Sequence, residues 1–116
     1  MSERGIEIEF LSGPRDGEVV CFESNQLDVG RDQGVHLQLS FDRLVSRRHA
    51  RIIREKDVFS VEDLDSSYGT TVDGTRVNGK REVNEANIIA FGHTELKIRE
   101  PHPDSQQKQA EAERSV

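Results

Sequence analysis

Short runs in which apolar and polar residues alternate recur along most of this chain. The clearest is Ile6–Phe10, where isoleucine and phenylalanine occupy every second position. Such alternation is typical of a β-strand with one buried face, because successive side chains of a strand point to opposite faces. Comparable short runs predict further strands at residues 18–22, 27–29, 36–39, 49–53, 58–61, 71–72, 87–91 and 95–98.

Tight turns separate several of these predicted strands. Asp73-Gly74 and Asn78-Gly79 are strong turn signals, since glycine, asparagine and aspartate tolerate the positive φ angles that such turns require. The segment 13–17, Gly-Pro-Arg-Asp-Gly, predicts a turn between the first two strands. No amphipathic helical pattern lies between the strands. Many short strands at close spacing predict an all-β protein, built as a sandwich or a barrel.

The length of the chain, 116 residues, suits one hydrophobic core and therefore one domain. We expect this domain to span residues 1–100. Residues 101–116 begin at a proline and carry no apolar stripe, so we expect a flexible polar tail or linker there. Within that tail only residues 106–114 have a composition compatible with a helix.

Cysteine content and the absence of long apolar segments bear on the compartment. The chain has one cysteine, Cys21, which cannot form an internal disulfide. Its first residues contain no apolar stretch of the kind found in signal peptides. The longest apolar run, 88–91, is far too short to cross a bilayer. We therefore expect a cytoplasmic protein without membrane association, and neither a metal site nor a cofactor.

The charge of the chain is acidic overall but unevenly distributed. A net charge of −6 argues against a general nucleic-acid binder, which usually has a basic face. Only residues 31–56 are net positive, with seven bases against three acids. An acidic protein with one basic segment is arranged to receive a localised anion rather than a long polyanion. Within this segment Arg48, Arg51 and Arg54 recur at three-residue spacing, and we expect most of them on a solvated face.

Three segments carry residue types that bind phosphate. In Gly30-Arg31, the glycine lets the backbone approach closely, and the guanidinium offers a fork of donors that matches phosphate oxygens. The segments 46–49 (Ser-Arg-Arg-His) and 66–70 (Ser-Ser-Tyr-Gly-Thr) add hydroxyl and loop N–H donors. Because the three segments occur together, we favour one phosphate-binding site.

Each of these residues also has an ordinary structural interpretation. Arg31 could form a strand-end salt bridge with Asp32 or Asp42. The hydroxyl of Ser46 could bond to nearby loop backbone, which is common for serine. The latter role is compatible with phosphate binding, because one hydroxyl can accept from the loop and donate to a phosphate.

The ordered set of segments resembles the forkhead-associated (FHA) domain family. The resemblance includes 63–65 (Asp-Leu-Asp) before the third segment and 72–74 (Val-Asp-Gly) after it, and it covers most of residues 5–100. It implies a β-sandwich of about eleven short strands whose loops, at one end, bind phosphothreonine. The expected partner is then a phosphothreonine-containing protein or peptide, such as a Ser/Thr kinase or its substrate.

The resemblance also implies roles for individual residues. Arg31 and Ser46 would contact the phosphate, Ser67 stands where a second hydroxyl is common, and Arg47 would border the peptide. A buried imidazole usually bridges loops through its two nitrogens, so we expect a structural role for His49 rather than a ligand contact. The residues expected to support the site are Gly30, His49, Gly69 and Thr70.

Tyr68 is the main departure from the family pattern. The family typically has an asparagine there, whose amide hydrogen-bonds the backbone of the bound peptide. A tyrosine has one hydroxyl on a rigid ring and cannot copy that amide; the loss of one such bond typically costs about 1 kcal/mol. Tyr68 therefore bears on peptide affinity and preference more than on phosphate capture, and its ring could stack on a peptide side chain.

Two other functions stay open beside a phosphothreonine-binding module for Ser/Thr kinase signalling. One is a phosphate-independent scaffold with a degenerate peptide site. The other is a hydrolase that uses Ser46, His49 and an aspartate. The chain lacks a Gly-x-Ser-x-Gly elbow, and three residues are a poor spacing for a nucleophile and its base. We therefore expect a binding protein and no enzyme.

Overall fold

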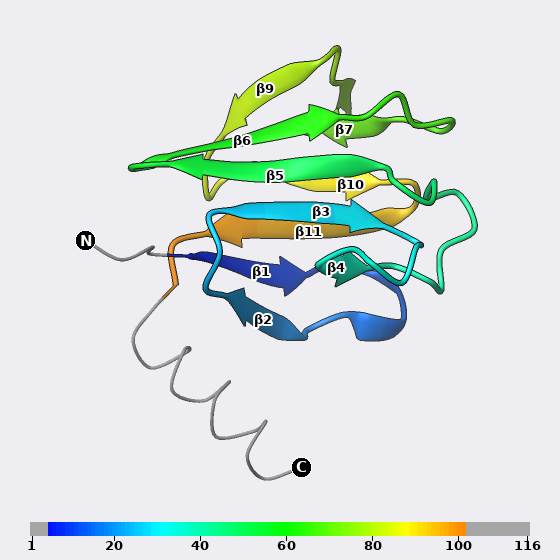
Figure 1. Ribbon diagram of the computed structural model, residues 1–116, viewed down its shortest axis with the longest axis horizontal. Coiled ribbons are helices and arrows are strands. Elements are labelled where there is room, and N and C mark those ends of the chain that lie inside the picture. The colour runs from blue at the N-terminus through cyan, green and yellow to red at the C-terminus, as the bar shows by residue number, and fades with distance from the viewer. Residues whose placement is uncertain (1–4, 102–116) are drawn as a thin grey trace, which may run out of the picture.

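The computed structural model describes residues 5–101 as two β-sheets packed face to face (Figure 1). This confirms the predicted all-β sandwich of about eleven short strands. Most of the predicted tail, including residues 106–114, lies outside the described residues. The strands are β1 (Ile6–Phe10), β2 (Val19–Phe22), β3 (Gln26–Gly30), β4 (Leu37–Gln38), β5 (Ala50–Glu55), β6 (Val58–Asp63), β7 (Thr70–Val72), β8 (Thr75–Arg76), β9 (Lys80–Val83), β10 (Ile89–Phe91) and β11 (Thr94–Arg99), with one 3₁₀ turn, η1 (Gly13–Arg15).

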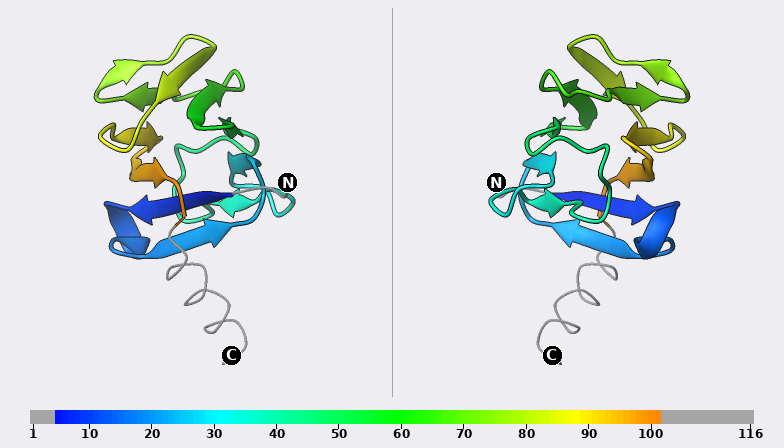
Figure 2. Two further views of the ribbon diagram at one scale, coloured as in Figure 1. Left: turned by 90° about the vertical axis from the view of Figure 1, so that its left-hand side faces the viewer. Right: turned by 90° about the vertical axis from the view of Figure 1, so that its right-hand side faces the viewer.

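The two sheets have six and five strands. Their strand orders are β2-β1-β11-β10-β7-β8 and β4-β3-β5-β6-β9. Neighbouring strands run antiparallel, except that β3 and β4 are parallel. The end-on views in Figure 2 show the sheets as two facing layers. Because the chain passes repeatedly from one sheet to the other, loops that are far apart in sequence lie at the same end of the sandwich.

The apolar side chains of the alternating runs form the core between the sheets. Ile6, Ile8 and Phe10 of β1 are fully buried. Burying one such side chain contributes about 1.5–3 kcal/mol. A register shift by one residue would expose this whole set, so burial fixes the pairing of Ile8 with Ile98. The other fully buried apolar residues include Leu27, Val29, Ile52, Val61, Val72, Ile89, Phe91 and Leu96.

Two strands had no signal in the apolar pattern. β8 contains two exposed residues, and β9 begins with the exposed charged run Lys80, Arg81 and Glu82, so neither shows alternation. The turn predicted at Asp73-Gly74 is present and joins β7 to β8. Both of its residues have positive φ, 51° and 84°, as the tight turn of a two-residue hairpin requires.

Arg54 is the one of the three evenly spaced arginines that does not lie on a solvated face. Its side chain is fully buried, because alternation along β5 turns it to the same inner face as Ile52. The guanidinium donates to the carbonyl of Gly5 at 2.8 Å, and Nη2 lies 3.3 Å from the carboxylate of Glu100. One buried arginine therefore holds both ends of the described fold.

Two further properties of residues 5–101 follow from this architecture. Within that range no helix is long and apolar enough to traverse a bilayer. The same range contains no group of three or more histidine, cysteine, aspartate or glutamate side chains that could hold a metal ion.

Candidate functional site

Several loops meet at one end of the sandwich, on the right in Figure 1. Strands β3, β4, β6 and β10 all run toward this end, so the loops that follow them become neighbours. Arg31 directly follows β3. Ser46 and Arg47 lie between β4 and β5, and residues 67–68 lie between β6 and β7.

The five predicted ligand-binding residues line a single open pocket, which we call the loop pocket. Its volume is about 410 Å³. Ser46 is half-buried and the other four side chains are exposed, so a ligand can reach all of them. No acidic residue of the described range lines the pocket, which is therefore cationic and rich in hydroxyls. The lining residues are Arg31, Arg43, Leu44, Val45, Ser46, Arg47, Ser67 and Tyr68.

Arg31 is held against the loop between β4 and β5. Its backbone N–H donates to the carbonyl of Ser46 at 3.1 Å, and its Nε donates to the carbonyl of Val45. Gly30 permits this close approach, since a Cβ there would lie 2.0 Å from the carbonyl oxygen of Arg47. The two terminal guanidinium nitrogens of Arg31 have no partner among the described residues and remain available to a ligand.

Asp42 braces two loops and forms no salt bridge with Arg31. Its carboxylate accepts from the backbone N–H of Leu44 at 3.0 Å, from that of His93 at 2.9 Å and from the Thr94 hydroxyl at 2.6 Å. Burial alone would raise the pKa of this carboxyl, but these hydrogen bonds outweigh it and the pKa is lowered. The charged Asp42 thus joins the β4–β5 loop to the β10–β11 turn, a role that the sequence analysis missed.

The hydroxyl of Ser46 connects the two hydroxyl-bearing loops. It accepts a hydrogen bond from the backbone N–H of Ser67 at 3.1 Å. A serine hydroxyl carries one proton and two lone pairs. Ser46 therefore bonds to the loop backbone and keeps its own proton for an acceptor in the pocket.

His49 lies beneath the pocket and bridges the same two loops. Its side chain is fully buried. Nδ1 accepts from the backbone N–H of Ser46 at 3.0 Å, and Nε2 lies 2.9 Å from the carbonyl oxygen of Gly69. Because Nδ1 accepts a hydrogen bond, Nε2 must carry the ring proton and donate a hydrogen bond to that carbonyl. The neutral imidazole therefore fixes the spacing of the two loops.

A network centred on Asp63 shapes the loop between β6 and β7. Its carboxylate accepts from the Ser66 hydroxyl at 2.6 Å and from the Thr70 hydroxyl at 2.7 Å. The Ser66 hydroxyl in turn accepts from the N–H of Gly69 at 3.0 Å. Burial alone would raise the pKa of Asp63, but the hydrogen bonds prevail and lower it. This network presents residues 67–68 at the loop tip.

Tyr68 lines the loop pocket and contacts His93, a residue of a second hollow. Its side chain is 50% exposed, and its ring contacts the His93 ring edge-on at a centroid distance of 5.7 Å. The second hollow, which we call the side pocket, has a volume of about 350 Å³ and shares Arg43 and Leu44 with the loop pocket. The side pocket is lined by Gly13, Pro14, Phe41, Asp42, Arg43, Leu44, His93 and Thr94.

Arg43, Leu44 and Val45 were not among the predicted site residues. Arg43 belongs to the basic segment 31–56, whose excess of positive charge was the one signal that could have identified it. A lone arginine in a polar loop has no periodicity, so sequence alone gave no reason to choose it over the others.

Burial of His49 predicts a pH-dependent stability. Burial lowers the pKa of this imidazole below 6.5, whereas the unfolded chain titrates at the ordinary value. Below pH 6.5 the unfolded state then binds more protons than the folded state. The contribution of His49 to the free energy of unfolding is therefore fully present above that pH and is lost as the pH drops through it. The lowered pKa values of Asp42 and Asp63 affect stability only below about pH 4.

We therefore expect urea denaturation to give a lower free energy of unfolding at pH 5 than at pH 7.5. An unchanged free energy over this range would contradict a neutral, buried His49.

With this geometry in place, comparisons with known proteins identify the family. A profile of the FHA domain matches residues 27–92. The FHA domain-containing protein FhaA of Mycobacterium tuberculosis is 35% identical over 71 residues, which cover 61% of this chain and 13% of that protein. The chain thus corresponds to a small part of this relative.

Solved structures agree with the match. A structure from a structural and functional analysis of phosphothreonine-dependent FHA domain interactions has a TM-score of 0.71 at 29% identity, covering 85% of this chain and 98% of that one. The FhaA FHA domain in complex with the intracellular domain of Rv3910 has a TM-score of 0.70 at 29% identity, covering 81% of this chain and 99% of that one. The FHA domain of CT664 from Chlamydia trachomatis has a TM-score of 0.73 at 27% identity, covering 84% of this chain and 99% of that one. Since the profile spans more than half of its length, this chain belongs to the FHA domain family.

Proposed function

We propose that this chain is a phosphothreonine-dependent protein-binding module that recruits phosphorylated partners in cytoplasmic Ser/Thr kinase signalling. The observation that carries the proposal is the convergence of Arg31, Ser46 and Ser67 on one pocket without a described acidic residue in its lining. A phosphothreonine brings a charge of about −1.5 to −2 at pH 7 and three strong acceptor oxygens. The similar FHA structure from work on phosphothreonine-dependent interactions supports the same ligand class.

Each lining residue has a role that its geometry allows. The free terminal nitrogens of Arg31 bind two phosphate oxygens as a fork. Ser46 donates the hydroxyl proton that its contact with Ser67 leaves available, and Ser67 offers its own hydroxyl. Arg47 and Tyr68 border the peptide. The supporting residues are Gly30, His49, Gly69 and Thr70.

The pocket wall also favours threonine over serine. Half-buried Leu44 gives the otherwise polar lining an apolar side, against which the γ-methyl of threonine can pack. One buried methyl-sized group contributes about 0.8 kcal/mol, which corresponds to roughly a fourfold difference in affinity. We therefore expect discrimination against phosphoserine to be moderate.

Calorimetric titration of three peptides with one sequence tests the proposal. We expect the phosphothreonine form to bind best, the phosphoserine form about four times more weakly, and the unphosphorylated form below detection. Affinity for the phosphothreonine form should also fall with added salt and as the pH drops through about 6, where the phosphate takes up its second proton. Equal binding of all three peptides would refute phosphate-dependent recognition.

A phosphate-independent scaffold is the second candidate, and Tyr68 is the observation that favours it. The tyrosine replaces the asparagine that typically bonds the peptide backbone in this family. Treating a bound partner with phosphatase separates the two functions: release of the partner supports phosphothreonine recognition, and retention supports the scaffold.

The geometry gives no support to a hydrolase built on Ser46 and His49. Nδ1 of the imidazole accepts a backbone N–H, and Nε2 donates to a backbone carbonyl. Neither nitrogen is free to take the proton of the Ser46 hydroxyl, which a general base must do. His49 is therefore assigned to loop support.

A further inference from the structure

The loop pocket carries more positive charge than one phosphate neutralises. Arg31, Arg43 and Arg47 all line it, which gives three permanent positive charges. A bound phosphothreonine supplies about −1.5 to −2. At least one unit of positive charge would therefore remain in the occupied pocket.

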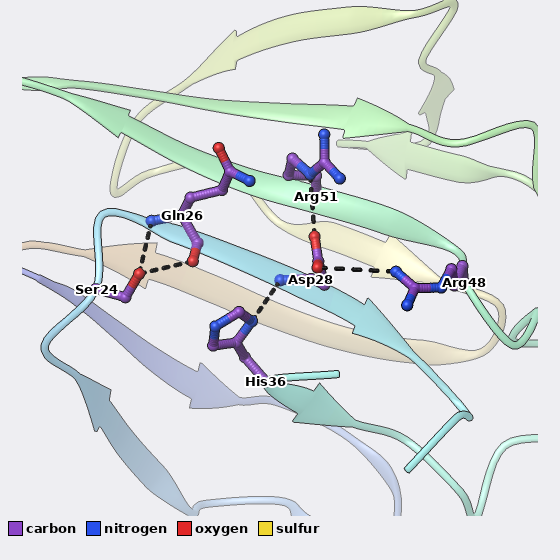
Figure 3. A network of polar contacts seen from close by, with 6 residues as sticks. All are labelled: Ser24, Gln26, Asp28, His36, Arg48 and Arg51. Carbon is purple, nitrogen blue, oxygen red and sulfur yellow. Dashed lines mark hydrogen bonds and ion pairs between the residues drawn. The ribbon is translucent and has the colours of Figure 1, made fainter. Parts of the chain in front are cut away.

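The arginines of the basic segment 31–56 divide into two groups of three. Those outside the pocket are paired: Arg48 and Arg51 lie 3.9 Å and 3.0 Å from the carboxylate of Asp28 on the outer face of the sheet (Figure 3), and Arg54 pairs with Glu100. The three in the pocket have no ion pair with any acidic residue of the described range. Each arginine of this segment outside the pocket thus lies within 4 Å of a carboxylate, whereas none of the three in the pocket does so among the described residues.

The positions of the three pocket arginines differ. Arg31 and Ser67 line the loop pocket only, whereas Arg43 also lines the side pocket. Arg43 therefore stands at the boundary between the two hollows. The neighbouring Asp42 is 7% exposed, and its carboxylate is occupied by the β10–β11 turn and the backbone of Leu44.

We infer that the ligand of this site carries a second anionic group close to the phosphothreonine, either an acidic side chain or a second phosphate, and that Arg43 binds it at the boundary with the side pocket. This inference rests on the proposed function. Both sources present oxygen anions to a guanidinium, so the site recognises the same chemistry in either case.

A peptide series measures this second contact. The reference is a phosphothreonine peptide with neutral flanking residues; in the variants, glutamate or phosphoserine replaces one residue at each of three positions on either side. At low salt we expect at least one position at which glutamate strengthens binding about two- to fivefold, the range of a partly exposed ion pair. A phosphoserine that binds there better than glutamate identifies a second phosphate, and the reverse identifies an acidic side chain.

Two glutamine variants assign the contact. In Arg43→Gln the gain from the second anion, measured as the ratio of that variant's affinities for the anionic and the neutral reference peptide, should disappear. Arg48→Gln is the matched control, since Arg48 is exposed and lies outside the pocket; it should keep the full gain. Equal melting temperatures for both variants and the wild type would show that the fold is retained.

The outcomes separate this inference from the function on which it rests. No gain at any of the six positions, together with phosphate-dependent binding, would overturn the inference alone. A gain that survives in Arg43→Gln would likewise overturn the assignment to Arg43. If the unphosphorylated peptide binds as well as the phosphorylated one, the proposed function itself is wrong.

Discussion

Replacement of Arg31 by alanine should weaken binding of a phosphothreonine peptide by roughly 30- to 1000-fold. Removing one partner of a hydrogen-bonded charge pair costs about 2–4 kcal/mol when the other charge is left unpaired in the site. Arg31 is well placed for such a pair, because its Nε is fixed on the Val45 carbonyl and its terminal nitrogens face no described partner. Titration calorimetry of the variant against the phosphorylated and unphosphorylated peptides measures the loss.

Two variants control this measurement. Arg48→Ala removes an exposed arginine of the same segment that is already near Asp28, and it should leave affinity within about twofold. Arg31→Lys keeps the charge but not the planar fork, and it should recover only part of the affinity. The Arg31 side chain is exposed, so the melting temperature should change little. Wild-type affinity in Arg31→Ala would show that the phosphate binds elsewhere.

Replacement of His49 by phenylalanine should lower the free energy of unfolding by about 2–5 kcal/mol. The phenyl ring fills a similar space but can neither accept nor donate a hydrogen bond. The N–H of Ser46 and the carbonyl of Gly69 would then lose their partners, and each unsatisfied buried group costs about 1–3 kcal/mol. Peptide affinity should also fall, because the same bonds fix the two loops that carry Ser46 and Ser67.

Urea denaturation of the wild type and the variant tests this prediction. His36→Phe serves as control: His36 is exposed and accepts only the backbone N–H of Asp28, so its loss should cost less than about 1 kcal/mol. The difference in stability between pH 7.5 and pH 5 should also shrink in His49→Phe. A destabilisation below 1 kcal/mol in His49→Phe would mean that the imidazole is not the bond between the loops.

The sequence predicted those parts of the fold that depend on burial of one strand face. Alternation identified β1 because Ile6, Ile8 and Phe10 all enter the core. It failed for β9, an edge strand whose first three residues are charged and exposed. Alternation also places Arg54 on the same face as Ile52, but no property of an isolated arginine indicates that a chain segment 49 residues away in sequence will cover it.

The residues of the candidate site could be predicted where a short stretch of sequence contains the relevant residue types side by side. A glycine before Arg31 and hydroxyls beside glycine in the third segment can be recognised within a few residues, and the residues predicted from them line one pocket. Asp42 and Arg43 could not be assigned in this way. Their roles arise from contacts with the β10–β11 turn, about fifty residues later, and from the meeting of two hollows that exists only in the folded chain.

The buried guanidinium of Arg54 has a mechanical consequence for any longer polypeptide that contains this fold. Gly5 and Glu100 both contact it, directly before β1 and directly after β11, and Figure 1 shows β1 beginning and β11 ending at the end of the sandwich opposite the loop pocket. Polypeptide segments attached before residue 5 and after residue 100 would then leave the domain close to each other. A partner bound in the loop pocket would lie at the opposite end of the domain.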